Sequence, residues 1–259
     1  MNAIDWVAII GAAAWAPQIF TWLYQFITKP KIILYLHTKP EIGYTSLGPI
    51  FNVSLALLSE KKGIALNNFS VSIKHESGAS YTFDWDGLSE DLSEIQNPLG
   101  QPTSIKKTYL PLVVRVLPLS VAQAFVRYQY KPFKEKFGQK LQAAQNKLQL
   151  LRNAGRLKTE QDIEALASEQ EFSDLVKQIH SEFIWIAGKY TVVFDFQSPG
   201  KFKYKKDKYT FSLSQDDIDG LRKNIDNIKL NTMQTAKAIV LQNYKAKEIS
   251  WEWRYPEIK

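Results

Sequence analysis

The sequence predicts an α+β protein with an N-terminal transmembrane helix, followed by an antiparallel β-sandwich with an inserted long helical hairpin and a further C-terminal helix. Three observations predict this class. The chain opens with an uncharged run, several short segments then alternate apolar and polar residues with period two, and stretches of helical periodicity interrupt them. We expect an anchor over residues 1–30 and a soluble domain over residues 31–259, with the helical insertion at 120–187.

The uncharged run near the N-terminus predicts a membrane-spanning helix. It extends over 23 consecutive residues from Trp6 to Thr28. A helix rises about 1.5 Å per residue, so the run matches the roughly 30 Å hydrocarbon core of a bilayer. Asp5 precedes it, whereas lysines follow it at positions 29, 31 and 39. The positive-inside rule therefore predicts a single-pass protein whose C-terminal domain is cytoplasmic.

Two other interpretations of this run are weaker. A cleaved signal peptide would explain the small residues from Ala12 to Ala16, but it requires a basic n-region, and the chain has no Lys or Arg before Lys29. A helix lying flat in the interface should carry Lys or Arg on its polar face, which this segment lacks. A spanning helix fits the residues best.

Small and polar residues form a stripe along the predicted helix. Their spacing alternates between three and four positions, which is typical of residues at helix–helix interfaces. In lipid, small residues permit close approach of helices, and glutamines form hydrogen bonds between them. We therefore expect a homo-oligomer whose stripe contacts partner helices or lines a narrow pore. The alternative is an anchor that tolerates two glutamines. The stripe comprises Gly11, Ala14, Gln18, Thr21, Gln25 and Thr28.

Period-two alternation predicts the strands of the soluble domain. The four residues from Glu76 to Ala79 contain glycine and serine, which favours a hairpin turn between two of these strands. The acidic segment 86–97 fits a loop or short helix. The predicted strands are 32–37, 49–58, 69–75, 81–85, 106–117, 189–197 and 201–213, with a closing strand at 249–255.

Three helices are expected between and after these strands. The first extends from Ser120, a plausible cap, to Asn153, with Pro132 bending it. The second begins at Thr159, where Asp162 completes a pattern close to a capping box, and pairs with the first as an antiparallel hairpin. Ser214 caps the third helix, which ends before position 246.

Residues for catalysis or metal binding are sparse. The chain has no cysteine, which excludes thiol catalysis, disulfides and cysteine–zinc sites. Its histidines at 37, 75 and 180 lack metal-ligand spacing, and no phosphate-binding or nucleophile-elbow motif occurs. We therefore predict a protein without enzymatic activity or a cofactor. An acidic group that could collect a cation, but lacks the EF-hand pattern, comprises Asp84, Asp86, Glu90, Asp91 and Glu94.

Basic residues gather in two places, and the net charge is +7. The run KFKYKKDK begins at Lys201, and on a strand its two aromatic rings lie opposite the alternating lysines. Lysines suit phosphates and aromatic rings stack on bases, so the patch could bind a nucleotide or oligonucleotide ligand. Protection of an edge strand and attraction to anionic lipids are the more common explanations of such a lysine row. The patch comprises Lys203, Lys205, Lys206 and Lys208, and the second group comprises Arg127, Lys131, Lys134, Lys136 and Lys140.

The segments GPIFNVSLAL and FSVSIKHESGASYTFDW, between Gly48 and Trp85, resemble those of bacterial membrane-tethered proteins with an immunoglobulin-like domain. The layout of one anchor and a cytoplasmic sensor is similar to that of membrane effectors in antiviral (anti-phage) defence, such as the Hailong type. This resemblance implies an inner-membrane ion channel controlled by a nucleotide from a partner synthase. Our leading hypothesis is thus an oligomeric membrane effector, and the alternative is a passive anchored module that recruits a cytoplasmic partner.

Overall fold

A computed structural model describes residues 14–24, 27–96, 102–109, 112–242 and 244–259, with the backbone alone at 90–96 and 102–109. Its strands form one strongly curled sheet, in which eight strands follow the order β10-β1-β3-β8-β5-β4-β9-β11 and four more attach to this path. The strands are β1 (Lys31–Leu36), β2 (Glu41–Thr45), β3 (Gly48–Glu60), β4 (Ile64–His75), β5 (Ser80–Gln96), β6 (Pro102–Tyr109), β7 (Val114–Val116), β8 (Val121–Gln129), β9 (Gly188–Gln197), β10 (Lys203–Tyr204), β11 (Lys208–Leu213) and β12 (Trp253–Arg254).

Alternating side chains of the long strands build the core. On β3, Val53, Leu55 and Leu57 are buried, whereas the residues between them are partly exposed. The curl of the sheet brings aromatic rings from distant strands together, and Phe51 lies 6.3 Å from Phe194 and 6.1 Å from Phe211, measured between ring centroids. Burial of these rings supplies much of the apolar area that stabilises the domain.

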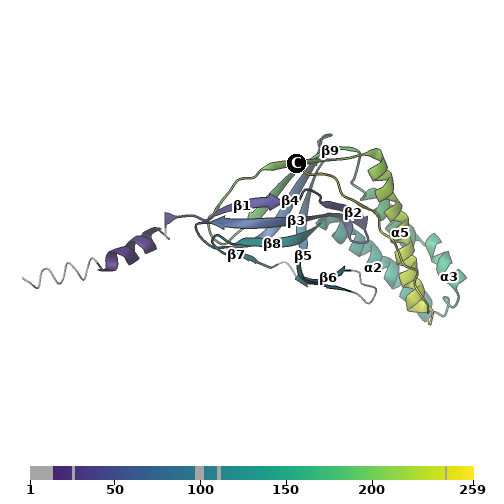
Figure 1. Ribbon diagram of the computed structural model, residues 1–259. Helices are drawn as coiled ribbons and strands as arrows, with labels where there is room; N and C mark the ends of the chain where they lie inside the picture. The colour runs from purple at the N-terminus through teal and green to yellow at the C-terminus, as the bar shows by residue number, and fades with distance from the viewer. Residues whose placement is uncertain (1–13, 25–26, 97–101, 110–111, 243) are drawn as a thin grey trace, which may run out of the picture.

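Apart from the helix at residues 14–24, the described helices gather at one end of the sheet (Figure 1). They are α2 (Lys131–Asn153), α3 (Glu160–Glu164), the 3₁₀ turn at Ala165–Ser168, α4 (Gln170–Ser181) and α5 (Gln215–Val240). Two buried polar contacts join them to β2. The hydroxyl of Tyr44 donates a hydrogen bond to the carbonyl of Ile179, and Trp185 Nε1 donates to the carbonyl of Gly43 at 3.0 Å. The helical layer is thus fixed to the sheet.

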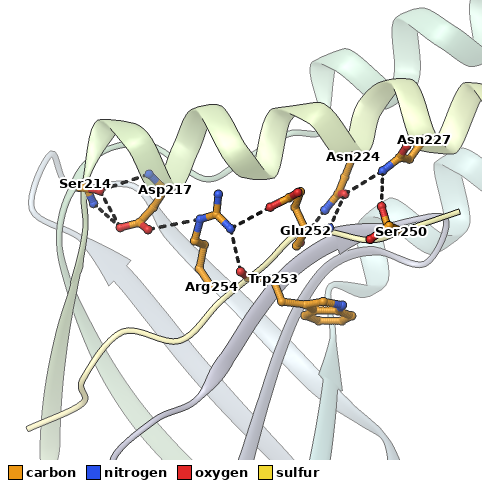
Figure 2. Close-up of polar contacts among 8 residues, drawn as sticks. All are labelled: Ser214, Asp217, Asn224, Asn227, Ser250, Glu252, Trp253 and Arg254. Atoms are coloured by element: carbon orange, nitrogen blue, oxygen red, sulfur yellow. Dashed lines mark hydrogen bonds and ion pairs between the residues drawn. The ribbon is translucent and has the colours of Figure 1, made fainter.

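The C-terminal segment runs along α5 and then joins the sheet (Figure 2). Trp253 and Arg254 form β12, which pairs with β2. Arg254 Nε lies 3.3 Å from Asp217 Oδ1 at the start of α5. Farther on, the backbones of Thr210 and Lys259 exchange hydrogen bonds of 2.7 and 2.9 Å. The last residues therefore connect α5, β2 and β11.

Several local expectations are confirmed. β4 and β5 form the predicted hairpin, with the turn between His75 and Ser80. Thr159 and Ser214 each cap a helix in a capping box, with Asp162 and Asp217 as the reciprocal partners. The mixed α+β class is confirmed as well.

Other expectations are wrong. Residues 121–129 form β8, which lies between β3 and β5, and the first helix begins only at Lys131. Pro132 lies in the first turn of α2, where a missing N–H is tolerated, so it helps to start the helix instead of bending it. The acidic segment continues β5 through Gln96 and pairs with β6. The predicted second helix is two helices, α3 and α4, separated by the 3₁₀ turn. Finally, the hydrogen bonds connect the main strands in one curled sheet, where a sandwich would have two.

Within the described ranges, no helix is both long enough and apolar enough to cross a membrane. The predicted span at 6–28 is described only at residues 14–24, 27 and 28.

Candidate membrane-facing site

Residues 14–24 form a helix that stands clear of the domain (Figure 1). Its large apolar side chains are all exposed, including Trp15 at 63%, Phe20 at 70% and Trp22 at 66%. Successive residues of a helix are rotated by about 100°, which places Phe20 and Leu23 on the side away from the predicted stripe, whereas Trp15 and Trp22 flank the stripe. A group of exposed apolar side chains of this kind marks an interaction site.

The polar stripe is partly described. Ala14, Gln18 and Thr21 lie on one exposed face, and Thr28 is half-buried at the junction with the domain. Gly11 and Gln25 lie outside the described residues. The Thr21 hydroxyl donates to the Pro17 carbonyl at 2.7 Å, so it needs no external partner. Assembly through the stripe stays a prediction.

A short junction connects this helix to the sheet. Pro30 is buried, and its carbonyl accepts a hydrogen bond of 2.8 Å from the backbone N–H of Lys203. Next to it, Lys31 pairs in register with Lys203 of β10 and with Glu60 of β3, and the Lys31 Nζ–Glu60 Oε2 distance is 3.0 Å. Because β1 pairs with β10 on one side and with β3 on the other, a displacement of the helix would be transmitted to the sheet through β1.

The predicted lysine patch lies beside this junction. As expected, its lysines are exposed, whereas the rings of Phe202 and Tyr204 pack against the core. The Tyr204 ring packs edge to face against Phe196, with 4.9 Å between the ring centroids. A nucleotide base would therefore have to stack on another side chain. Two of the four lysines form ion pairs: Lys205 with Asp207 at 2.8 Å and Lys206 with Asp195 at 2.6 Å. Lys203 and Lys208 form no ion pair within the described ranges, so they carry the remaining positive charge of this patch.

The second basic group forms ion pairs within the domain. Its members connect β8 and α2 to acidic residues of β5 and to the region of α4, and this local neutralisation weakens the group as an anion site. The pairs are Arg127–Asp86 at 2.9 Å, Lys131–Asp84 at 3.1 Å, Lys134–Asp86 at 3.6 Å, Lys136–Glu182 at 2.7 Å and Lys140–Asp174 at 3.3 Å. Asp84 and Asp86 of the predicted acidic group thus take part in ion pairs. The side chains of Glu90, Asp91 and Glu94 lie outside the described residues.

Other candidate ligand sites include an open hollow of about 610 Å³ between β11 and the C-terminal segment. A pocket of about 110 Å³ lies between α2, α4 and α5, which is well below the roughly 300 Å³ typical of small-molecule sites. His75 is buried, and its Nδ1 lies 2.8 Å from Ser77 Oγ in the hairpin turn. The described side chains include no group of three or more residues placed to hold a metal ion.

One surface feature was missed by sequence reasoning. Residues 112–121 expose a row of leucines and valines at the end of the sheet where the N-terminal helix enters. The sequence interpretation assigned this stretch partly to a strand and partly to a helix, and either assignment would bury every second or third residue. Its composition alone does not distinguish core from surface.

Comparisons with known proteins show no family. No protein-family model and no curated protein matches the chain. The crystal structure of Spo0M, a sporulation control protein from Bacillus subtilis, is similar at 10% identity with a TM-score of 0.29, over 78% of this chain and 56% of that one. A family 123 glycoside hydrolase from Clostridium perfringens is similar at 8% identity with a TM-score of 0.31, over 72% of this chain and 28% of that one. The chain thus spans about half of the first protein and less than a third of the second, and similarity this low indicates nothing about function.

Proposed function

We propose that this chain is a single-pass membrane protein without enzymatic activity, and that it acts as an oligomeric effector whose domain faces the cytoplasm. The observation that carries the proposal is the exposed helix at 14–24. Trp15, Ile19 and Phe20 are each at least 59% exposed, and the domain leaves them uncovered. A bilayer can cover such a surface without leaving backbone polar groups unsatisfied, because the helix forms its own backbone hydrogen bonds.

Membrane extraction tests the anchor. Full-length protein expressed in bacteria should stay in the membrane pellet after an alkaline carbonate wash and should dissolve only with detergent. Recovery in the aqueous fraction, or a mature form that begins after Ala16, would remove the proposal. A variant that carries Ile19→Glu and Phe20→Glu should move into the soluble fraction, because charges near the centre of a span each cost about 3 kcal/mol.

The effector part of the proposal rests on the polar stripe, with Gln18 and Gln25 facing neighbouring helices or a pore. The double variant Gln18→Leu, Gln25→Leu should insert normally but lose ion conductance in liposomes. Phe20→Leu, on the opposite face of the helix, is the matched control and should conduct. Unchanged conductance in the double variant would exclude a pore lined by this stripe.

A passive anchored module is the alternative, and one observation favours it. The second basic group and half of the lysine patch form ion pairs within the domain, which leaves fewer cations for a nucleotide. Single cysteines separate the two functions, since the chain has none of its own. Gln18→Cys should cross-link to dimers in native membranes and Phe20→Cys should not. If neither variant cross-linked to a dimer, the passive module would be favoured.

A further inference from the structure

We infer that residues 112–121, here named the apolar edge segment, form a second membrane contact, which enters the lipid interface beside the N-terminal helix. The inference rests on the proposed anchor, because it requires this end of the domain to face the bilayer. Through this contact the domain would take one fixed orientation on the membrane instead of swinging about the junction at Pro30.

The apolar edge segment exposes large aliphatic side chains one after another. Single exposed leucines are ordinary on protein surfaces, but a contiguous group marks a binding surface. Within the segment, residues Val114–Val116 form β7. This strand pairs with β4, so the backbone of the segment is held in place. The exposed members are Leu112 at 77%, Val113 at 56%, Leu117 at 48%, Leu119 at 81% and Val121 at 58%.

The segment lies where the N-terminal helix enters the domain. The N–H of Leu119 donates to the carbonyl of Ser59 at 2.9 Å, and Ser59 also bridges to Pro118. In the sheet, Ser59 lies opposite Ile32, directly after the junction. Figure 1 shows β7 at the end of the sheet from which the N-terminal helix departs. A membrane that holds the helix would therefore lie close to the segment.

Leu119 adopts a backbone conformation that is unusual for leucine. Its φ is +54°, in the left-handed region that glycine and asparagine normally occupy. Strain of this kind persists where the surrounding structure imposes it, and it is concentrated at functional positions. Here it holds the most exposed aliphatic side chain of the segment away from the domain, as insertion into lipid requires.

Positive charge lies near the segment, on the helix junction, the β3–β4 turn and the loop before β10, and Gly63 of that turn lies against Pro118. Lys29, Lys61 and Lys201 are exposed and form no ion pair with any described residue. Two of them, Lys29 and Lys201, line a shared depression of about 450 Å³ between the helix junction, the β3–β4 turn and the loop before β10. Basic side chains here would contact the anionic phosphates of lipid headgroups, and the neighbouring aliphatic side chains would insert below the phosphates. This charge favours a lipid surface over an apolar protein partner.

The apolar surface also continues into the sheet. Leu112, Val113 and Val121 line one side of a hollow of about 580 Å³, and core residues such as Leu55 and Phe69 line the other. Leu55 and Phe69 are almost fully buried, so the apolar surface of this hollow that meets water belongs to the apolar edge segment, and lipid would cover it favourably.

Single labelled cysteines test the contact in the full-length protein. Leu119→Cys carries an environment-sensitive nitrobenzoxadiazole fluorophore in vesicles of phosphatidylcholine with phosphatidylglycerol. We expect a blue shift of its emission and quenching by a nitroxide placed on the lipid chains just below the headgroups. Leu150→Cys, at a position 68% exposed on α2, is the matched control and should show neither effect. Lys61→Glu with Lys201→Glu should reduce the quenching at position 119.

Phe20→Cys separates failure of this inference from failure of the anchor. Quenching at position 20 without quenching at 119 would overturn the second contact and leave the anchor intact. Quenching at 119 without quenching at 20 would overturn the anchor, and with it the inference of a second contact beside the N-terminal helix. A blue shift at 119 without lipid quenching would show that protein covers the segment, and would overturn the contact with lipid.

Discussion

Asn224 on α5 and the backbone of Glu252 exchange two hydrogen bonds, so that one buried side-chain amide joins the C-terminal segment to the helix. Asn224 Nδ2 donates to the Glu252 carbonyl at 2.7 Å, and its Oδ1 accepts from the Glu252 N–H at 2.8 Å. Asn227 adds a hydrogen bond of 2.8 Å to the Ser250 carbonyl, one turn along the helix (Figure 2). The Asn224 side chain therefore satisfies the backbone N–H and carbonyl of Glu252, which lies just before β12 and has no strand partner among the described residues.

Removal of this amide should destabilise the domain. Asn224→Ala leaves the N–H and carbonyl of Glu252 without partners, and each unsatisfied buried group costs about 1–3 kcal/mol. We expect a lower urea midpoint for the detergent-solubilised protein, measured by tryptophan fluorescence. Lys223→Ala, one exposed position away on the same helix, is the control and should change the midpoint little. Equal midpoints for the two variants would show that the C-terminal segment does not depend on Asn224.

Gly220 should couple energetically to Arg254. A Cβ atom at Gly220 would lie 1.4 Å from Arg254 Nη2, so alanine must displace the guanidinium and its ion pair with Asp217. Alanine also favours the helix by about 1 kcal/mol over glycine. We expect Gly220→Ala to be nearly neutral in the native chain and to stabilise by about 1 kcal/mol in an Arg254→Ala background. Equal effects in both backgrounds would contradict the coupling.

Two buried tyrosines should respond differently to loss of the hydroxyl. Tyr44 donates a hydrogen bond to the Ile179 carbonyl, and Tyr44→Phe should cost about 1 kcal/mol of unfolding free energy. The Tyr128 hydroxyl is buried and has no hydrogen-bond partner among the described residues. Tyr128→Phe should therefore be neutral or stabilising, because it removes an unsatisfied buried group. Denaturant titration of both variants checks this, and a large loss at Tyr128 would reveal a partner for its hydroxyl.

Stability should fall in alkaline solution. Burial raises the pKa of Tyr190 from 10.0 to about 12, and burial also raises the pKa of Tyr44, Tyr128 and Tyr204. Above pH 10 the unfolded chain loses tyrosine protons that the folded chain keeps, so rising pH favours unfolding. The contribution of Tyr190 is complete below pH 10 and disappears as the pH approaches 12.

Unfolding free energies measured across this pH range, together with tyrosinate absorbance, check the prediction. The Tyr190→Phe variant should show a shallower decline with pH than the native chain, because it lacks one of the linked groups. Gradual ionisation at the pKa of free tyrosine, without unfolding, would contradict it.

Features that depend only on neighbouring residues could be predicted from the sequence. The capping boxes at Thr159 and Ser214 and the turn at 76–79 were predictable because each needs only a few consecutive side chains. Alternation on β3 and β4 was equally local. The run at 6–28 carries its membrane prediction in its own composition.

Features that depend on partners distant in the sequence emerge only in the folded chain. Residues 121–129 suit a helix or a strand, and pairing with β3 and β5 on both sides makes them a strand. Lys136 was expected to attract anions, but Glu182, 46 residues away, lies 2.7 Å from it. Likewise, Leu119 became a surface residue only because the bridge to Ser59 holds it at the end of the sheet. Hydrogen bonds and ion pairs between distant residues depend on how the chain folds back, and local composition does not encode that path.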